Sequence, residues 1–305
     1  MKSVQSVSLF DYLNEVREIQ EVNSKLGQGS LYLGDAVSVL KTLPGSSVQV
    51  AITSPPYWGL RDYGVDGQIG AESTVDEYIK KLVEVFRELR RVLADDGVFW
   101  LNVGDSYTSG GRKWRQADKK LAARGMSYRP DTPEGMKPKD LIGVPWMLAF
   151  ALRNDGWYLR TDIVWNKPNS LPESVRDRPT RSHEFLFMLT KSERYYYDVS
   201  ATLEPTENGK KMRRKRSVWN VNTEAFPGAH FATFPTKLVE PCILASSVEG
   251  QTVIDPFFGS GTVGQVARNL GRDFIGIELN REYVDIAHKR LEDSSGYDLP
   301  IIVQQ

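Results

Sequence analysis

The sequence predicts a doubly wound α/β protein with a mostly parallel sheet. Short β-rich runs such as VQVAITS (residues 48–54) and FIGIEL (274–279) alternate with segments whose apolar residues recur at helical spacing. Strands that alternate with helices are typical of a parallel sheet covered by helices on its faces. Polar and glycine-rich turns follow the ends of two strands, at 54–57 and 256–261. The carboxyl edge of such a sheet is where ligands bind.

Composition and charge exclude several classes of protein. Of the 305 residues, 40% are hydrophobic and 26% are charged, and the formal net charge is zero; these values are ordinary for a globular protein. No apolar stretch approaches the length of a membrane span, and the N-terminus lacks the apolar core of a signal peptide, so we expect a cytoplasmic protein without membrane association. The single cysteine, Cys242, excludes a disulfide framework and a cysteine zinc site, and we expect no metal.

The helix and strand predictions rest on periodicity and on residues typical of helix ends. Residues 74–97 have apolar residues at helical spacing, Thr74 as a cap with Glu77 three positions later, and Gly97 as a stop. Residues 106–138 are rich in glycine, proline and basic residues and predict a long mobile loop. Further helices are expected at 36–43, 139–156, 235–248, 261–271 and 280–293, and strands at 30–35, 48–54, 98–105, 157–167, 182–198, 252–257 and 274–279.

The most informative segment is VIDPFFGSGT (253–262). It predicts a strand that ends in Asp255 and a loop with Gly259 and Gly261 that turns into a helix; a second strand ends in Glu278. The glycines nearly match the dinucleotide pattern G-x-G-x-x-G, but Asp255 would face the anionic pyrophosphate of such a ligand. A cationic nucleoside cofactor without phosphates suits the two carboxylates better. S-adenosylmethionine is the obvious candidate.

Three segments together resemble the amino-methylating DNA methyltransferases, which methylate exocyclic nitrogens of cytosine or adenine. DPFFGSGT resembles the cofactor motif of this family, TSPPY (53–57) its catalytic motif, and HFATFPTKLVEPCI (230–243) the segment that caps the methionine end of the cofactor. The catalytic motif precedes the cofactor motif, which is the permuted order of the family's β class. The resemblance covers residues 29–293. It implies a Rossmann-like, circularly permuted fold of the class I S-adenosylmethionine-dependent methyltransferases.

The resemblance assigns the chemistry to Ser54, Pro55, Pro56 and Tyr57. An exocyclic amine is a poor nucleophile because its lone pair is delocalised into the ring. Hydrogen bonds from its N–H groups to Ser54 and to a prolyl carbonyl would favour the form with an available lone pair. Tyr57 would stack on a base that has been flipped out of the duplex. The alternative is a plain proline turn that ends a strand.

The resemblance also implies a cofactor site, for which two residues have alternative roles. Asp35 could contact the cofactor adenine and also cap the helix that follows it, whereas Phe257 could stack on adenine or pack in the core. The family has a segment comparable to SHEF (182–185) near the flipped base, where a lone histidine is more often structural. The expected cofactor-binding residues are Asp35, Phe231, Phe234, Pro235, Asp255, Phe257, Gly259, Gly261, Thr262 and Glu278.

DNA contacts are expected from a segment between the two halves of the domain and from the rim of the catalytic turn. GKKMRRKRSVWNVN (209–222) supplies cations for phosphates, together with polar and aromatic side chains for bases. A solvated charge run is the alternative. The expected DNA-binding residues are Trp58, Arg61, Lys210, Lys211, Arg213, Arg214, Lys215, Arg216, Trp219, Asn220 and Asn222.

The chain is therefore expected to consist of five parts. These are an N-terminal helical extension (1–28), a catalytic half (29–197), a target-recognition segment (198–229), a cofactor-binding part of the same domain (230–293) and a C-terminal tail (294–305).

Together these observations predict a site-specific DNA methyltransferase. Serine at position 54 resembles the cytosine-N4 enzymes, whereas adenine-N6 enzymes more often carry aspartate there; cytosine-N4 is expected and adenine-N6 stays open. A catalytically silent DNA-binding module of the same fold is a further alternative. The expected partner is double-stranded DNA, a restriction endonuclease would act separately, and both a monomer and a homodimer stay open.

Overall fold

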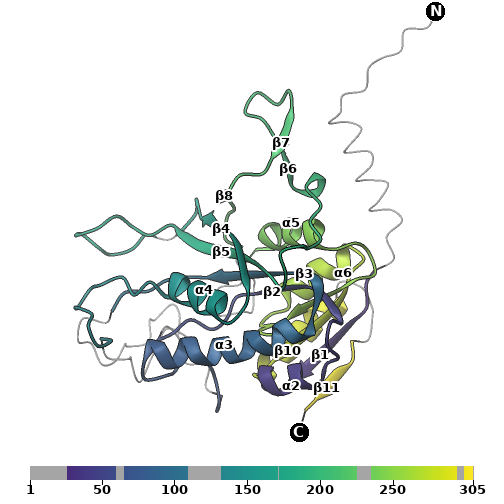
Figure 1. Ribbon diagram of the computed structural model, residues 1–305, viewed down its shortest axis with the longest axis horizontal. Helices are drawn as coiled ribbons and strands as arrows, with labels where there is room; N and C mark the ends of the chain where they lie inside the picture. The colour runs from purple at the N-terminus through teal and green to yellow at the C-terminus, as the bar shows by residue number, and fades with distance from the viewer. Residues whose placement is uncertain are drawn as a thin grey trace, which may run out of the picture.

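The fold is described from a computed structural model, in residues 26–59, 65–108, 132–170, 172–224, 235–293 and 299–304. A nine-stranded sheet runs through the middle of this part of the chain, and helices cover both of its faces (Figure 1). The expected helical extension at 1–28 and most of the loop at 106–138 lie outside the described residues.

The sheet is parallel throughout except at one strand, which confirms the predicted fold class. Its order is β11-β1-β10-β9-β2-β3-β5-β4-β8. Only β5 runs against its neighbours β3 and β4. The strands are β1 (Gly29–Leu33), β2 (Val48–Thr53), β3 (Leu93–Val103), β4 (Tyr158–Asn166), β5 (His183–Thr190), β8 (Val218–Asn220), β9 (Thr252–Asp255), β10 (Asp273–Glu278) and β11 (Ile301–Val303).

The two halves of the chain interleave in the sheet. β1 lies in parallel register with β10, with Leu33 opposite Glu278, and β2 pairs with β9, with Ala51 opposite Ile254. The C-terminal strands therefore lie beside the first strand, in one continuous sheet with the N-terminal half. As a result, the ends of β1, β10, β9, β2 and β3 all meet at the same carboxyl edge.

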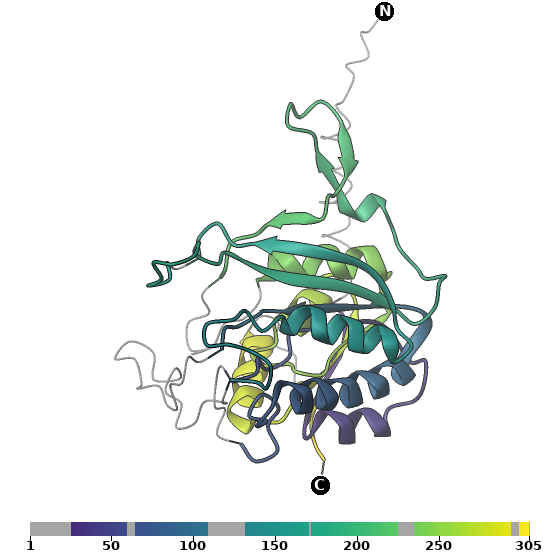
Figure 2. The ribbon, with the colours of Figure 1, turned by 60° about the vertical axis from the view of Figure 1, so that its left-hand side comes forward.

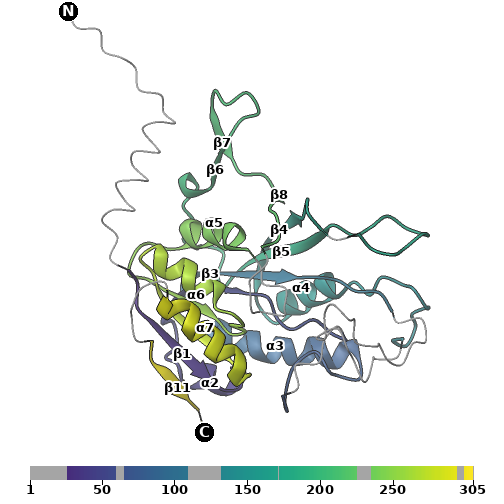
Figure 3. The ribbon, with the colours of Figure 1, turned by 180° about the vertical axis from the view of Figure 1, so that it is seen from behind.

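Each face of the sheet has its own helical layer, as the view from behind shows (Figure 3). The residues of α2 (Ala36–Thr42), α3 (Val75–Val92) and α4 (Val144–Asn154) join one buried hydrophobic cluster. Those of α5 (Thr236–Ser246), α6 (Thr262–Asn269) and α7 (Arg281–Asp293) join a second cluster on the opposite face. Cys242 lies in this second cluster, and its thiol contacts the Leu238 carbonyl. The prediction that Cys242 is a core residue is confirmed.

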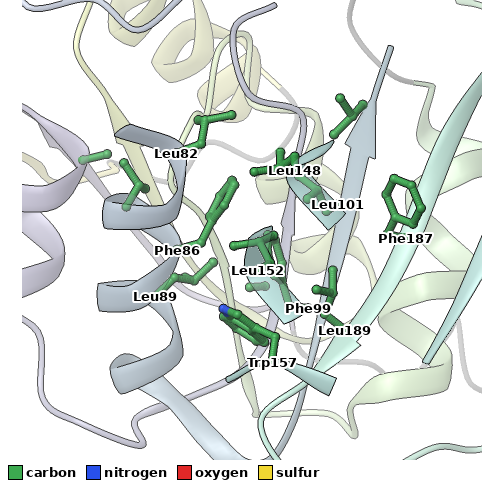
Figure 4. Close-up of a cluster of buried hydrophobic side chains, with 14 of the residues drawn as sticks. Leu82, Phe86, Leu89, Phe99, Leu101, Leu148, Leu152, Trp157, Phe187 and Leu189 are labelled. Atoms are coloured by element: carbon green, nitrogen blue, oxygen red, sulfur yellow. The ribbon is translucent and has the colours of Figure 1, made fainter. Parts of the chain in front are cut away.

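Helix α3 shows how the local sequence builds this core. Its apolar stripe includes Leu82, Phe86 and Leu89, which are fully buried and face the sheet, and the Phe86 ring lies 4.9 Å from that of Phe99 (Figure 4). The predicted cap is confirmed, because the Thr74 hydroxyl accepts a hydrogen bond from the helix at 3.2 Å.

The predicted end of this helix at residue 97 was wrong. The helix ends at Val92, and β3 begins at once with Leu93, which is fully buried opposite Val48 of β2. Pairing of this apolar residue with the sheet therefore overrides the helical periodicity.

The polar segment at 198–229 contributes a projecting hairpin. Strands β6 (Leu203–Pro205) and β7 (Met212–Arg214) pair only with each other, follow the short helix η2 (Ser200–Thr202), and extend away from the body on the side of α5 (Figures 1 and 2). The chain then returns to the main sheet as β8. Within the described ranges, no helix is both long enough and apolar enough to cross a membrane.

Candidate active site and cofactor loop

The carboxyl edge of the sheet brings together the motifs that the sequence analysis singled out. Asp255 ends β9, Glu278 ends β10, and Ser54 follows β2 directly. Asp35 follows β1, whose next residue, Gly34, donates a backbone hydrogen bond to the Glu278 carbonyl at 2.9 Å. Residues more than 200 positions apart in the sequence thus line one edge, as the permuted order predicts.

Two carboxylates organise the glycine loop after β9. One Asp255 oxygen accepts a hydrogen bond from the Phe257 N–H at 3.0 Å, and one Glu278 oxygen accepts from the Gly259 N–H at 2.8 Å. Gly259 and Gly261 have φ values of 51° and 82°, a left-handed conformation that favours glycine. The loop is therefore held in shape by the same two carboxylates that the sequence assigns to the cofactor.

Arg290 of α7 stabilises the far end of this loop, a role that the sequence analysis missed. Its guanidinium donates to the Ser260 carbonyl at 3.1 Å and to the Thr262 hydroxyl at 3.0 Å. Burial lowers the pKa of Arg290. Thr262, predicted as a cofactor residue, is buried at the start of α6. Its hydroxyl accepts the hydrogen bond from Arg290.

A buried hydrogen bond connects the cofactor loop to the catalytic turn. The Thr53 hydroxyl donates to Asp255 Oδ1 at 2.6 Å, and the two residues are 0% and 2% exposed. Burial raises the pKa of Asp255 from 3.8 to about 7; the Glu278 charge adds to the rise, whereas the bonds from Thr53 and Phe257 oppose it. Thr53 stands directly before Ser54, so this hydrogen bond joins the end of β9 to the start of the catalytic turn.

The raised pKa gives a stability prediction for Asp255→Asn. Between about pH 4 and pH 7 the folded state keeps a proton on Asp255 that the unfolded state loses. The contribution of this group to stability is therefore most favourable below pH 4 and falls as the pH rises to about 7. Asparagine carries no charge and keeps one acceptor oxygen. Urea unfolding at several pH values should show that the free energy of unfolding of the variant, relative to that of wild type, increases by up to about 4 kcal/mol from pH 4 to pH 8. A difference that does not change with pH would contradict the assignment.

The catalytic turn is fixed by its neighbours on both sides. The Pro56 carbonyl accepts a hydrogen bond from the Tyr78 hydroxyl at 2.7 Å. Trp58 is 5% exposed, and its indole N–H donates to the Glu72 carbonyl at 2.9 Å. Trp58 is therefore a core residue and not the DNA contact at the rim that the sequence predicted, because its side chain belongs to the buried cluster that includes residues of α2, α3 and α4.

Tyr57 lies at the centre of a short chain of polar contacts. Its hydroxyl donates to Glu184 Oε2 at 2.9 Å, and Ser54 Oγ lies 3.5 Å from the same hydroxyl. Burial and the nearby Glu184 charge raise the pKa of Tyr57 well above its usual value. Glu184 in turn forms an ion pair with Lys167. Lys167 was not predicted, although it directly follows a strand end, which is the signal that could have found it.

Gly104 makes this arrangement sterically possible. It follows β3, and a Cβ atom added there would lie 2.7 Å from the Tyr57 ring and 3.3 Å from a Glu184 oxygen. His183, the neighbour of Glu184, packs edge-on against Phe185. Burial and the Arg181 charge lower the pKa of His183. The expectation of a structural histidine agrees with this packing.

The remaining cofactor predictions have mixed outcomes. The Asp35 carboxylate accepts hydrogen bonds from the N–H and the hydroxyl of Ser38, both at 2.9 Å, so its alternative role as a helix cap is confirmed. The Phe257 ring is partly buried and lies edge-on to Phe86 at 6.3 Å. Pro235 precedes α5. Phe231, Phe234 and, on the DNA side, Arg61 lie outside the described residues.

The predicted DNA-binding residues separate into two groups. Trp219 is 4% exposed in the core beside Trp100, with its N–H bonded to the Arg216 carbonyl, so the expected base contact is wrong for this residue. Asn220 ends β8 at the carboxyl edge and accepts a hydrogen bond from Asn166 at 2.8 Å, while Asn222 is exposed. The cations instead lie on the projecting hairpin, before β8.

Part of the hairpin charge is neutralised locally. Glu204 of β6 bonds to Arg213 at 3.0 Å and lies 4.0 Å from Lys215. These three residues line an open cavity of about 520 Å³ together with residues 216–220. Four further cations are exposed to solvent: Lys210, Lys211, Arg214 and Arg216.

Several known proteins are similar to this chain in sequence. A family model described as DNA methylase, for N6 and N4 methyltransferases, matches residues 48–289. The chain is 64% identical to the type II methyltransferase M.Cfr9I of Citrobacter freundii over 88% of this chain and 89% of that protein. It is 56% identical to M.SmaI of Serratia marcescens over 95% and 98% of the two chains.

Solved structures share the fold. A putative DNA modification methylase from Thermus thermophilus, in complex with S-adenosyl-L-methionine, matches with a TM-score of 0.65 at 23% identity, over 91% of this chain and 99% of that one. The cytosine-N4-specific PvuII DNA methyltransferase matches with a TM-score of 0.66 at 19% identity, over 91% and 96%.

Proposed function

The chain belongs to the DNA methylase family, and from this premise we propose that it methylates the exocyclic N4 amine of a cytosine flipped out of duplex DNA. It is an S-adenosylmethionine-dependent DNA methyltransferase of the type II kind. One observation supports cytosine, and not adenine, as the methylated base. A serine hydroxyl, and not a carboxylate, stands at the start of the catalytic turn, 3.5 Å from Tyr57 and one residue after the buried Thr53–Asp255 bond.

The turn offers two acceptors to the amine of the target base. Ser54 Oγ is one. The Pro56 carbonyl is already bonded to Tyr78, whereas the Pro55 carbonyl accepts no hydrogen bond within the described part of the chain. We assign the second acceptor to Pro55. Two acceptors on the amine N–H groups draw its lone pair out of conjugation, and they position it for attack.

The residues at the sheet edge fit the cofactor. S-adenosylmethionine, when bound, would supply an electrophilic methyl group: the amine lone pair would form the new N–C bond as the S–C bond breaks, the sulfur would leave as a neutral thioether, and the amine would release one proton to water. Asp255 and Glu278 suit a cationic nucleoside because carboxylates accept hydrogen bonds and complement positive charge. The left-handed glycines between them leave backbone open to close approach. Tyr57 presents an aromatic ring to the flipped base, and stacking of this kind is worth about 1–3 kcal/mol.

Product analysis tests this proposal. The purified protein is incubated with unmethylated DNA and labelled S-adenosylmethionine, and the nucleosides are separated by mass spectrometry. We expect N4-methylcytosine. N6-methyladenine would keep the fold, cofactor and mechanism but overturn the role given to Ser54. Cofactor binding without any methylated nucleoside, on DNA that contains all short sequence contexts, would favour the silent DNA-binding module.

The basic hairpin gives a prediction for DNA affinity. Changing Lys210, Lys211, Arg214 and Arg216 to serine should weaken DNA binding. The negative slope of log K against log salt concentration should become shallower by up to about 4, since each phosphate contact contributes about 0.9 to its magnitude. The rate of methyl transfer at saturating DNA should stay within about twofold, because the hairpin lies away from the carboxyl edge. The control changes Lys41 of α2 and Lys80 of α3, which are exposed on the other layer. An equal loss in both variants would argue against a specific role.

The relatives also suggest the biological setting. Because chains 56–64% identical to this one are named type II methyltransferases, we assign the protein to the modification half of a restriction–modification system that acts in the cytoplasm. A restriction endonuclease would act there as a separate protein. DNA recovered from cells that express the chain should resist cleavage by an endonuclease that reads the mapped methylation site.

A further inference from the structure

Hydrogen bonds connect Ser54, Tyr57 and Glu184. The chemistry of Glu184 fixes which group donates and which accepts in each of them. Glu184 lies at the start of β5, where the antiparallel strand enters the carboxyl edge. One of its carboxylate oxygens accepts from Lys167, and the other accepts from the Tyr57 hydroxyl at 2.9 Å. A carboxylate can only accept hydrogen bonds. The Tyr57 proton must therefore point toward Glu184, away from Ser54.

The orientation of the Tyr57 hydroxyl in turn decides whether Ser54 donates or accepts. With its proton used by Glu184, the Tyr57 oxygen presents only lone pairs to the Ser54 hydroxyl, which lies 3.5 Å away. Ser54 can contact it favourably only as a donor. Its own lone pairs then remain for the substrate, and an exocyclic amine offers N–H donors. Active-site hydrogen bonds that are long in a free enzyme commonly shorten when the substrate is bound.

Lys167 and Glu184 are held firmly enough to fix this direction. Their side chains are only 16% and 17% exposed, so water competes little for either group and the charged hydrogen bond is strong. The Lys167 ammonium also lies 4.1 Å from the centre of the Trp165 ring, a cation–π contact. Trp165 is itself buried and bonded to the Val221 carbonyl.

We propose that Glu184, anchored by Lys167, is a positioning residue that orients the Tyr57 and Ser54 hydroxyls so that Ser54 accepts a hydrogen bond from the target amine. The inference rests on the proposed amine methylation and adds to it a reason for the ion pair beside the catalytic turn. It gives Tyr57 two separate tasks. Its ring stacks on the base, and its hydroxyl transmits the direction of hydrogen bonding.

Two variants without large changes of volume separate this role from packing. Tyr57→Phe keeps the ring and removes the hydroxyl, so Ser54 is free to rotate and we expect single-turnover methyl transfer about tenfold slower. Glu184→Gln places an amide beside both neighbours. Because Lys167 needs the acceptor oxygen, the amide N–H of the new side chain faces Tyr57 and donates to it. The Tyr57 hydroxyl must then donate to Ser54, and the Ser54 proton points at the target amine. We expect a loss of about 100-fold, since a reversed bond costs more than a missing one.

The double variant provides the decisive measurement. Without the Tyr57 hydroxyl, a reversed amide at position 184 has nothing to transmit. Y57F/E184Q should therefore recover to the rate of Y57F alone, about tenfold faster than E184Q. The dissociation constant for DNA, measured by fluorescence anisotropy, should change less than threefold in all three variants. By contrast, Tyr57→Leu, which removes the ring, should weaken DNA binding.

The possible results distinguish failure of the positioning role of Glu184 from failure of the proposed amine methylation. A double variant as slow as E184Q, or slower, would overturn the positioning role, as would wild-type rates in both single variants. Thermal unfolding and cofactor binding are measured on each variant, and Lys167→Arg, which keeps the charge, should retain most of the activity. Failure of amine methylation itself would appear separately, as wild-type protein that forms no N-methylated nucleoside.

Discussion

Replacement of Ser54 by alanine should lower the rate of methyl transfer by about 10²–10³-fold, the usual cost of removing one oriented hydrogen-bonding group from an active site. The reason is that the amine loses its side-chain acceptor and keeps only the Pro55 carbonyl. Cofactor affinity should not change, because Ser54 lies at the end of β2 whereas the cofactor loop is held by Asp255 and Glu278. Rapid-quench single-turnover kinetics with labelled cofactor measures the effect.

A matched variant makes this result interpretable. Ser54→Thr keeps the hydroxyl and adds one methyl group at a partly buried position, so it should retain far more activity than the alanine variant. If both variants lost activity equally, volume at this position would matter and the acceptor would not. If the alanine variant methylated DNA at the wild-type rate, the proposed mechanism would be wrong.

The Gly104→Ala variant should lose activity by about 100-fold for a different reason. The new Cβ would lie 2.7 Å from the Tyr57 ring, so the ring must shift. That shift breaks the 2.9 Å bond from Tyr57 to Glu184 and displaces the stacking surface. A displacement of about 1 Å in an active site commonly costs 10²-fold. Unlike the Ser54 variant, this one should also bind DNA more weakly.

Gly45→Ala is the appropriate control for this variant. Its added Cβ would meet nothing closer than 3.5 Å, at the Arg91 carbonyl, which is an ordinary contact. The control variant should keep wild-type rates and DNA affinity. A fully active Gly104→Ala protein would show that the Tyr57 ring can move without consequence for catalysis.

The sequence predicted the fold and the two motif loops because they rest on local signals. Strand ends followed by prolines or glycines are visible in a single chain, and the permuted order placed β1 beside β10. Lys167 and Gly104 could not be predicted in the same way. Their roles depend on which residues the antiparallel strand β5 brings beside Tyr57; the position of Lys167 after a strand end marks it as a candidate site residue but does not indicate that contact.

The errors at Trp58 and Trp219 have a common cause. Trp58 directly follows the predicted catalytic turn and Trp219 follows a run of basic residues, and these positions suggested contacts with DNA. Each satisfies its single N–H with a backbone carbonyl nearby, Glu72 for one and Arg216 for the other. Once that donor is paired, burial of a large ring is strongly favourable. The position of a tryptophan in the sequence therefore says little about its exposure.

The interleaving of β1 between β10 and β11 has a consequence for how the protein is made. Leu31 in the first of these strands is fully buried, yet its neighbours in the sheet are Gly276 and Ile301. On the ribosome, β1 emerges long before its partners, and pairings so distant in sequence form slowly. The sheet edge that carries both motif loops is therefore complete only when almost the whole chain has been synthesised. Nascent chains in which β10 has not yet been synthesised would then have no methylating activity.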